Sequence, residues 1–321
     1  MAYLESEAKK LYRMADKIEE VNWSAGYASD IDLTMRILPD IYDFTERAIQ
    51  TVTCNDNALR AVLGLSGGID SCVCSYVVAE TMKNAIQKND VHDADIVLLN
   101  WNARSDEDTN YSRQCFQQLK YRYPQIKIQY AEQDLNPLLR NMGKMTDTLL
   151  NAMRHKKIYP GELATRVIDC MALEYADKTG HCVIDSTNKS EIILGEIVIG
   201  AGGEVALLAN LFKSQVYDIA EALDIPESII RRKPINSTFG TDKIAGYFGE
   251  IPSDFSPRDI YRVLDLALLL LYDKKYSPER LAQELGHSKT FTQKLSRRIE
   301  NQNHRRAIPC FSIYEMDEFS T

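Results

Sequence analysis

The sequence predicts an α/β protein with a doubly wound parallel sheet and helices on both faces of that sheet. Two observations indicate this fold. Short runs rich in Val, Ile and Leu alternate with longer segments of helical pattern between residues 61 and 185, and buried strands joined by helices are typical of parallel sheets. The first run passes directly into a Ser-Gly-Gly loop and then into a helical segment, which places a polar loop at the carboxyl end of a strand.

Length and composition indicate a globular protein. The chain has 321 residues, of which 45% are hydrophobic. No apolar run approaches the ~20 residues that span a bilayer, and the acidic N-terminal residues do not resemble a signal peptide. We therefore expect a cytoplasmic protein without membrane contact. The net charge of −8 argues against broad nucleic-acid binding.

The cysteines indicate neither a disulfide framework nor a zinc site, because their number is odd and no CxxC pair is present. We interpret them as small buried apolar residues. They stand at positions 54, 72, 74, 115, 170, 182 and 310.

The residues ahead of the first predicted strand are mostly helical in pattern. Apolar side chains recur there at helical spacing, for example at Leu4, Ala8 and Leu11. We expect a helical N-terminal extension over residues 1–58 that packs on a domain formed by residues 59–321.

The sheet region contains alternating strand-like and helix-like segments. The predicted strands cover residues 61–65, 94–99, 126–131 and 181–185. The predicted helices cover residues 72–88, 108–122 and 161–179. Ligands of such sheets bind at the carboxyl ends of the strands, where Ser66 and Ser186 would both lie.

Helical segments also dominate the C-terminal part of the chain. Residues 213–231 have the pattern of one helix and the start of another. A loop rich in Asn, Ser, Thr and Gly follows from residue 234 to residue 257, and we interpret it as a lid over a binding site. Three further helices are predicted at residues 257–273, 278–286 and 289–301.

Residues 66–71, Ser-Gly-Gly-Ile-Asp-Ser, have the composition of a phosphate-binding loop. The glycines let the backbone approach oxygen anions, the serines add hydroxyl donors, and the following helix directs free amides at the same place. The loop is not a P-loop, because it lacks the four-residue gap and the Gly-Lys-Ser/Thr ending. Asp70 stands where a P-loop has lysine, which indicates that a magnesium ion supplies the positive charge.

A second polar motif, Asp-Ser-Thr-Asn-Lys-Ser-Glu at residues 185–191, follows the last predicted strand of this region. The order of strand, Ser-Gly-Gly-x-Asp-Ser and helix is the pyrophosphate-loop signature of the N-type ATP pyrophosphatases. With the second motif, the chain resembles the ammonia-dependent NAD synthases, which have a Rossmann-like fold. The resemblance extends over roughly residues 40–311 through three more segments, at residues 211–216, 225–234 and 303–309.

The resemblance implies a two-step reaction with ATP as co-substrate. A small-molecule carboxylate, deamido-NAD in this family, attacks the α-phosphorus to form an acyl-adenylate and release pyrophosphate. Ammonia then displaces AMP and gives an amide. The protein must neutralise the triphosphate, align the carboxylate and exclude water.

Motif positions transfer the family's site residues to this sequence. Four residues match its β,γ-phosphate loop: Ser66, Gly67, Gly68 and Ser71. Asp70 and Glu191 match its two Mg²⁺-binding carboxylates and Lys213 matches its phosphate lysine, and these three are the candidate catalytic residues. The remaining candidate ATP-binding residues are Arg166, Ser186, His304 and Arg305. Without the resemblance, Glu191 also fits an acidic helix start and Lys213 a solvated one.

The chain departs from the family mainly at residues 194–204. Ala201 occupies the place of the first aspartate in a motif that holds the pyridine end of deamido-NAD, and the aromatic contact is also missing. Glu204 is a candidate replacement for the second acid, and Glu196 places a charge where stacking is expected. Smaller departures are Ser186 for a threonine, Ile168 for an arginine, Lys243 for a glutamate and Arg305 for a lysine. We therefore expect the ATP half of the site to be intact and the acceptor half to be altered.

The resemblance also implies partners. The residues ahead of Ser66 are too few for a glutaminase domain, so we expect ammonia to be free or to come from a separate glutaminase subunit. A homodimer is implied, with the acceptor site near the subunit contact.

Three other interpretations remain open. The same adenylation and amidation chemistry can act on a different carboxylic acid, which the altered residues 194–204 favour. Residues 277–306 also fit a DNA-binding helix-turn-helix with Arg297 and Arg298 among its phosphate contacts, although the acidic net charge argues against it. The fold also occurs in enzymes that thiolate tRNA, but neither a reactive cysteine pair nor an RNA-binding domain is evident.

Overall fold

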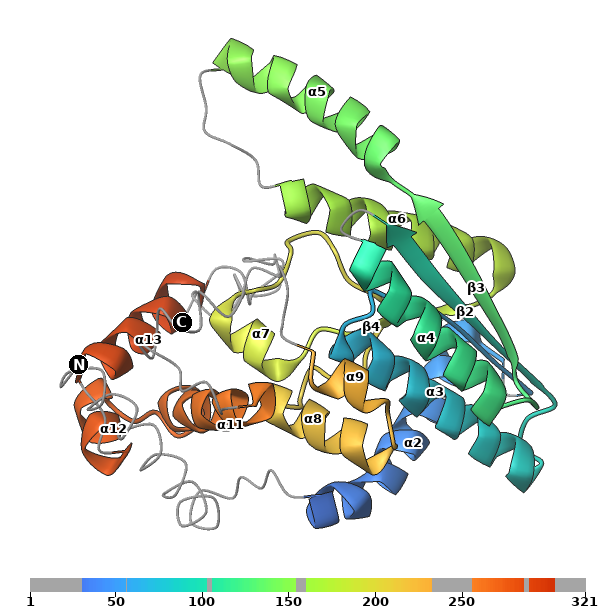
Figure 1. Cartoon of the computed structure of the whole chain (residues 1–321), viewed down its shortest axis with the longest axis horizontal. Helices are drawn as coiled ribbons and strands as arrows, with labels where there is room; N and C mark the ends of the chain where they lie inside the picture. The colour runs from blue at the N-terminus through green and yellow to red at the C-terminus, as the bar shows by residue number, and fades with distance from the viewer. Residues whose placement is uncertain are drawn as a thin grey trace, which may run out of the picture.

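Parallel strands form the sheet at the centre of the computed structural model, which describes residues 31–55, 57–102, 106–153, 160–232, 256–285 and 289–303 (Figure 1). The five-stranded sheet has the order β3-β2-β1-β4-β5, and every neighbouring pair is parallel. The strands are β1 (Ala58–Gly64), β2 (Asp93–Asn102), β3 (Lys127–Asp134), β4 (Cys182–Asp185) and β5 (Val205–Ala206). From β1 the chain adds β2 and then β3 on one side of the sheet. It then adds β4 and β5 on the other side of β1. A crevice is expected between the carboxyl ends of these two strands.

Helices cover both faces of the sheet, as the sequence predicts. α3 (Ile69–Lys88) and α4 (Asp106–Arg122) pack on one face, and α6 (Pro160–Thr179) packs on the other. The side chains of β1 alternate accordingly. Leu63 joins the large core that includes α3 and α4, whereas Val62 joins a smaller cluster with α6. The doubly wound architecture is confirmed.

A second group of helices follows β4 in the chain. It comprises α7 (Lys189–Leu194), α8 (Lys213–Ala222), α9 (Glu227–Ile230), α11 (Pro257–Leu268), the π-helical turn η1 (Leu269–Asp273), α12 (Pro278–Leu285) and α13 (Lys289–Asn301). α11 packs on α8, α12 packs on α13, and the N-terminal helix α2 (Ile31–Thr53) packs on α3 and α8. Leu38 and Ile49 of α2 belong to the large core. The domain division after residue 58 stays a prediction.

The structure contains elements that the sequence patterns do not predict. α5 (Asn136–Met153) follows β3 and extends away from the body of the molecule, in contact with α6 (Figure 1). Its sequence begins with Asn-Pro and contains Gly143, which are residues typical of turns. β5 has two residues and is too short to show a periodic pattern. Residues 234–255 of the expected lid lie outside the described residues.

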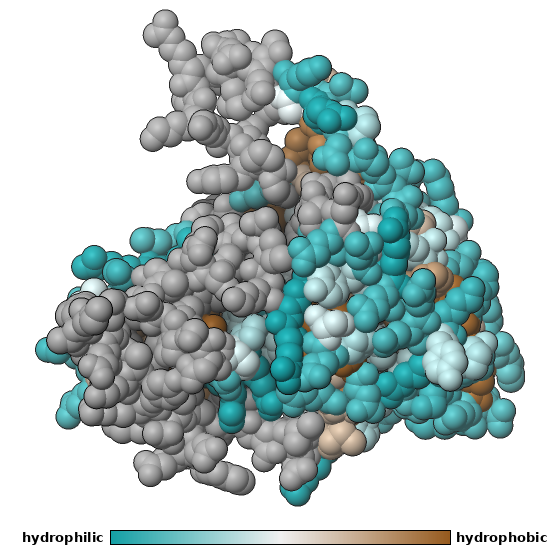
Figure 2. Space-filling model, in the orientation of Figure 1, coloured by the Kyte–Doolittle hydropathy of each residue, from teal (hydrophilic) through white to brown (hydrophobic). Residues whose placement is uncertain are grey.

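Composition gave two further expectations. None of the helices among the described residues has the length and apolar character needed to cross a membrane. On the face shown in Figure 2, the surface of the described residues is mostly hydrophilic. Cys72, Cys74, Cys115 and Cys182 are buried as expected, whereas Cys54 and Cys170 are exposed.

Candidate active site

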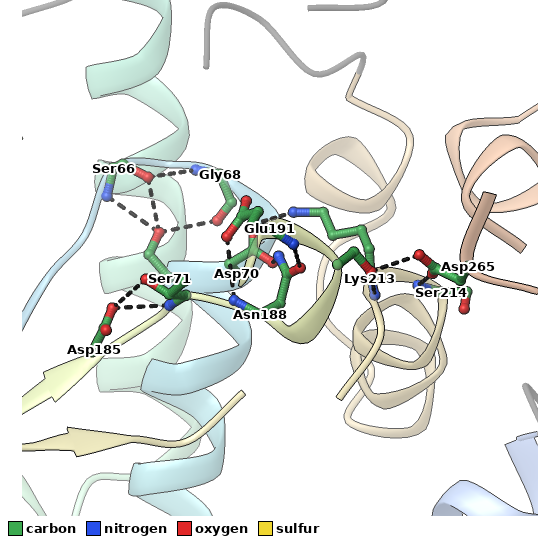
Figure 3. Close-up of polar contacts among 12 residues, drawn as sticks. Ser66, Gly68, Asp70, Ser71, Asp185, Asn188, Glu191, Lys213, Ser214 and Asp265 are labelled. Carbon is green, nitrogen blue, oxygen red and sulfur yellow. Dashed lines mark hydrogen bonds and ion pairs between the residues drawn. The ribbon is translucent and has the colours of Figure 1, made fainter. Parts of the chain in front are cut away.

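Residues 66–71 form a tight loop between β1 and α3, at the carboxyl end of the central strand. Gly67 has a φ of +75°, and a Cβ atom there would lie 2.4 Å from the carbonyl oxygen of Asp108, so this position requires glycine. The N–H of Ser66 donates to Ser71 Oγ (3.2 Å), and the N–H of Gly68 donates to Ser66 Oγ (3.3 Å). Figure 3 shows these groups gathered in one small region. The loop thus offers amide and hydroxyl donors to an anion.

The first turn of α3 completes this loop. Ser71 Oγ donates to the carbonyl oxygen of Gly68 (3.0 Å), and Gly68 is the N-cap of α3 without a side-chain cap. The positive end of the helix therefore faces the loop. The structure brings together the four residues that the sequence analysis assigns to phosphate binding.

Asn188 connects the second motif to the loop. It caps α7 in a capping box with Glu191, in which the N–H of Glu191 donates to Asn188 Oδ1 (3.0 Å) and the N–H of Asn188 donates to Glu191 Oε2 (3.2 Å). The Nδ2 group of Asn188 donates to Asp70 Oδ1 (3.1 Å). The start of α7 is thereby fixed against the start of α3 (Figure 3).

Lys213 begins α8 and forms an ion pair with Asp70 (Figure 3). Its side chain is only 9% exposed. Burial lowers the pKa of Lys213, but the negative charges of Asp70 and Glu191 outweigh burial and raise it above its usual value. The ammonium group is therefore charged at neutral pH beside the loop.

Asp70 and Glu191 have the chemistry of a magnesium site. Burial and the charge of Asp70 raise the pKa of Glu191 to about 7, so the two carboxylates interact and a divalent cation would relieve their repulsion. Both supply oxygen ligands only, which suits Mg²⁺. Among the described residues there is no group of three or more His, Cys, Asp or Glu side chains suited to a metal. Two carboxylates with water and phosphate in the other positions are a common Mg²⁺ arrangement.

Asp265 of α11 accepts hydrogen bonds from the starts of α7 and α8. Ser190 Oγ donates to Asp265 Oδ1 (2.6 Å), the N–H of Ser214 donates to Asp265 Oδ2 (2.7 Å), and the N–H of Lys213 donates to Ser190 Oγ (2.9 Å). Asp265 is fully buried, and burial raises its pKa to about 6 although the Ser190 and Ser214 hydrogen bonds act in the opposite direction. One carboxylate therefore positions the helices that carry Glu191 and Lys213.

A pocket of about 200 Å³ adjoins the loop between the sheet and α6. Its apolar lining includes Leu65, Leu99, Trp101 and Ile168, and its polar lining includes Ser66, Asp169, Asp185 and Ser186. This lining contains hydrogen-bond acceptors and flat apolar walls but no Lys, Arg or His among the described residues. It suits an uncharged ring system with hydroxyl groups rather than a phosphate chain.

Arg166 lies beside residues 195–204, which we call the acceptor segment. Its Nε donates to the carbonyl oxygen of Ile199 (2.8 Å), and its Nη2 pairs with Glu162 (3.0 Å). Arg166 lines a second pocket, of about 560 Å³, with residues 200–203. The structure places it at the acceptor segment, and its assignment to ATP stays a prediction.

Asp169 lines both pockets. Its Oδ2 accepts from the N–H of Gly202 (2.8 Å), and a Cβ atom on Gly202 would lie 3.7 Å from Asp185 Oδ2. Burial raises the pKa of Asp169 to about 6, the Gly202 hydrogen bond opposes this shift, and the charge of Asp185 adds to it. Two carboxylates thus meet at the acceptor segment next to Ala201.

The two glutamates of the acceptor segment are held by the protein itself. Glu196 forms a buried ion pair with Arg298 of α13, whose Nε also donates to the carbonyl oxygen of Leu194 (2.9 Å). Glu204 Oε2 accepts from the N–H of Val183 (2.9 Å). Glu196 is therefore a structural group rather than a charge facing a ligand, and Arg298 is not a free phosphate contact as the DNA-binding interpretation requires.

A close side-chain contact fixes one end of the acceptor segment, and a close backbone contact fixes the other. A Cβ atom on Gly195 would lie 2.3 Å from Gln302 Cβ, and one on Gly203 would lie 2.6 Å from the carbonyl oxygen of Val183. The segment therefore begins against α13 and ends against β4.

Three residues to which the sequence analysis gives no role hold the site together. Asn188 stands at the start of Asn-Lys-Ser-Glu, a pattern in which a capping box can be recognised. Asp265 is an acid flanked by apolar residues in α11, which signals a buried partner. Arg232 donates to the carbonyl oxygen of Gly67 (2.8 Å), and no local pattern signals that contact.

Two predicted ATP-binding residues, His304 and Arg305, lie outside the described residues. Ser186 lies at the carboxyl end of β4 and lines the same pocket as Ser66. This placement agrees with the expectation from strand order.

The family model described as NAD synthase matches residues 39–309. The NH(3)-dependent NAD(+) synthetase of Pyrococcus furiosus is 25% identical over 79% of this chain and 88% of its own length. The protein of the same name from Methanocaldococcus jannaschii is 28% identical over 79% of this chain and 88% of its own length.

Two solved structures share the fold. An NMN synthetase from Francisella tularensis has a TM-score of 0.58 at 17% identity, over 85% of this chain and 96% of that chain. An NH3-dependent NAD synthetase from Campylobacter jejuni has a TM-score of 0.57 at 19% identity, over 85% of this chain and 96% of that chain. At these identities the likeness concerns the fold.

We expect Asp169→Asn to stabilise the folded protein above pH 6. The pKa of Asp169 rises from 3.8 to about 6 on folding, so the wild-type free energy of unfolding falls as pH rises between these values. Asparagine keeps an acceptor for Gly202 without a charge. The variant's free energy of unfolding should exceed that of the wild type by on the order of 2 kcal/mol above pH 7. The difference should vanish near pH 4. Urea denaturation between pH 4 and pH 8 measures it.

Asp177→Asn on the same helix is the control, because Asp177 is exposed. Its effect should be small and independent of pH. A stability gain for Asp169→Asn that is equally large at pH 4 and pH 8 would contradict the assigned burial effect.

Proposed function

Because this chain belongs to the NAD synthase family of ATP-dependent ligases, we propose that it forms NAD from deamido-NAD and ammonia with cleavage of ATP to AMP and pyrophosphate. One observation beyond family membership carries the proposal. Asp70, Glu191 and Lys213 come from three different helices and lie together at the loop of residues 66–71 (Figure 3). This combination of donors, one cation and two carboxylates matches the demands of a metal-bound triphosphate.

The triphosphate of ATP binds at residues 66–71 and its nucleoside occupies the adjoining 200 Å³ pocket. Ser66 belongs to both the loop and the pocket lining, so a continuous nucleotide fits across them. The loop amides donate hydrogen bonds to the phosphate oxygens, and Lys213 adds a fixed positive charge. Ser186 lies at the junction with the acceptor segment.

The reaction proceeds without a covalent bond to the protein. The acceptor carboxylate attacks the α-phosphorus, the bond to the β-phosphate oxygen breaks, and pyrophosphate leaves. Ammonia then attacks the acyl carbon, AMP leaves, and the nitrogen loses a proton. Lys213 remains protonated because its pKa is raised, so its role is charge stabilisation rather than proton abstraction.

We propose that Asp70 and Glu191 hold a magnesium ion when ATP is bound. The ion supplies positive charge to the triphosphate and to the departing pyrophosphate. The interaction between the two carboxylates supports this assignment.

A second candidate acceptor is a different carboxylic acid. The observation that favours it is the composition of the acceptor segment, where Ala201 supplies no polar side chain and Asp169 and Asp185 meet at Gly202. Ammonia comes from solution or from a separate glutaminase subunit.

We also propose that the chain forms a homodimer through α5 and α6. α5 extends from the body (Figure 1). Leu138 and Met145 of α5 and Met171 and Leu173 of α6 are exposed. Exposed apolar side chains on two contacting helices favour burial against another surface, and a second copy in twofold symmetry buries the same helices on both subunits.

Purified protein supplied with deamido-NAD, ATP, ammonia and Mg²⁺ should release AMP, pyrophosphate and NAD in equal amounts. Separation of the nucleotides by chromatography measures all three. Turnover of another carboxylic acid without turnover of deamido-NAD selects the second candidate acceptor. No AMP release with any acid overturns the ligase assignment for this chain.

Asp70→Ala should reduce pyrophosphate release by about 100-fold or more, because it removes a magnesium ligand and leaves Lys213 without its partner. A continuous pyrophosphate assay measures the loss. Asp93→Ala is the matched control, since Asp93 is an exposed carboxylate at the start of β2 that pairs with Arg60. Equal rates in the two variants would refute the role of Asp70.

Ala201→Asp should change the KM for the acceptor by about tenfold and the KM for ATP by less than about threefold. Ala201 lines the second pocket with Asp169, outside the loop of residues 66–71. Steady-state kinetics with each substrate varied in turn separates the two effects. A comparable change in both constants would count against the division into ATP and acceptor halves.

The full chain should have the mass of a dimer in light scattering. Met145→Lys places a charge on the exposed face of α5 and should shift the protein toward monomer. Tyr121→Lys on α4, where Tyr121 is 89% exposed, is the control and should leave the mass unchanged. A monomeric wild-type chain would rule out this interface.

A further inference from the structure

Arg232 makes three contacts, one with Gly67 in the loop of residues 66–71 and two with residues of α4. Its Nη1 donates to the carbonyl oxygen of Gly67 (2.8 Å), its Nη2 forms an ion pair with Asp108 of α4, and its guanidinium group lies 4.6 Å from the ring centroid of Tyr111. The side chain is 9% exposed. Arg232 follows α9, so it reaches the loop from 165 residues further along the chain.

The contact with Gly67 fixes the direction of one peptide group. A trans peptide is planar, and its C=O and N–H point in opposite directions. When Arg232 holds the carbonyl oxygen of Gly67, the N–H of Gly68 must point to the other side. That N–H donates to Ser66 Oγ (3.3 Å), inside the loop where the proposed phosphate oxygens bind.

Without the Arg232 contact, the peptide between Gly67 and Gly68 keeps the hydrogen bond from the Gly68 N–H to Ser66 Oγ, which at 3.3 Å is long. Glycine has no Cβ atom and populates both signs of φ, and Gly67 already has a φ of +75°. If this peptide turned over, the carbonyl oxygen of Gly67 would face into the loop in place of the N–H of Gly68. Such an oxygen would repel a phosphate.

Only arginine provides both contacts from one side chain. The planar guanidinium group donates from two nitrogens at once, whereas a lysine ammonium is a point charge. Asp108 is itself 14% exposed at its side chain, so the pair is nearly neutral as seen from the loop. The function of Arg232 is therefore to direct the loop rather than to attract the nucleotide by its charge.

We propose that Arg232 is a positioning residue for the β,γ-phosphate subsite, which keeps the N–H of Gly68 directed at the phosphates. This assignment rests on the proposed function, because it takes residues 66–71 as the site of the triphosphate. It adds a residue that lies outside both sequence motifs. It also predicts that ligands with and without β- and γ-phosphates respond differently to its loss.

The test compares nucleotide binding by isothermal titration calorimetry in the full-length protein. The ligands are ATP, pyrophosphate and AMP, each with Mg²⁺. The variants are Arg232→Gln, Arg232→Lys and the control Arg231→Gln. Arg231 is the neighbouring arginine, is 77% exposed, and forms an ion pair with Glu227.

Arg232→Gln should weaken the binding of ATP and of pyrophosphate by about tenfold each, which is the effect of one charge-assisted hydrogen bond. The Kd for AMP should stay within about twofold of the wild-type value, because AMP lacks the β- and γ-phosphates that the loop is proposed to hold. Arg232→Lys should behave like Arg232→Gln, and Arg231→Gln like the wild type. AMP binding also reports that each variant is folded.

Other outcomes overturn the assignment. If Arg232→Lys binds ATP as the wild type does, the residue contributes charge and not direction. If the variant weakens AMP binding as much as ATP binding, the role of Arg232 is general packing. Wild-type protein that binds neither ATP nor pyrophosphate overturns the proposed function as well, whereas wild-type binding that Arg232→Gln leaves unchanged overturns the positioning role alone.

Discussion

The carboxylate of Asp70 joins the three helices that form the candidate site. Asp70 lies in the first turn of α3, Asn188 caps α7, and Lys213 begins α8. One oxygen of Asp70 accepts from Asn188 and the other pairs with Lys213. Because all three residues lie at helix starts, each helix is fixed at the end nearest the loop of residues 66–71. Removing one partner from such a buried pair costs several kcal/mol, so the same contact determines both geometry and charge.

Asp265 extends this arrangement to the C-terminal helices. It is a fully buried acid that accepts hydrogen bonds from Ser190 and Ser214, and an unpaired acid at that depth would be strongly unfavourable. The hydrogen bonds therefore specify one arrangement of α7, α8 and α11. Since Glu191 and Lys213 are adjacent in sequence to these serines, α11 determines the placement of both side chains at the loop of residues 66–71. The ring of Tyr261 in α11 also lies 5.8 Å from Lys213 Nζ.

Local chemistry explains what the sequence could predict. The loop of residues 66–71 and the expected strands are recognisable because glycine, serine and apolar residues occur in short fixed patterns. The contacts of Asp70 with Asn188 and of Arg232 with Gly67 join residues 118 and 165 positions apart, which no local pattern specifies. The pairing of Glu196 with Arg298 was missed for the same reason. α5 escaped prediction because its Pro and Gly residues are typical of turns.

The fixed ends of the acceptor segment have a consequence for how this protein can change. Gly195 lies against Gln302, and Gly203 lies against Val183. The two ends of the acceptor segment are therefore fixed, and we call the residues between them the cassette. Substitutions inside the cassette leave the contacts of Asp70 with Asn188 and Lys213 in place. If these residues set the acceptor preference, as proposed, that preference can diverge during evolution while ATP cleavage is retained. In the proposed reaction, grafting the corresponding stretch from a relative, with Gly195, Glu196 and Gly203 kept, would lead to a new amide product.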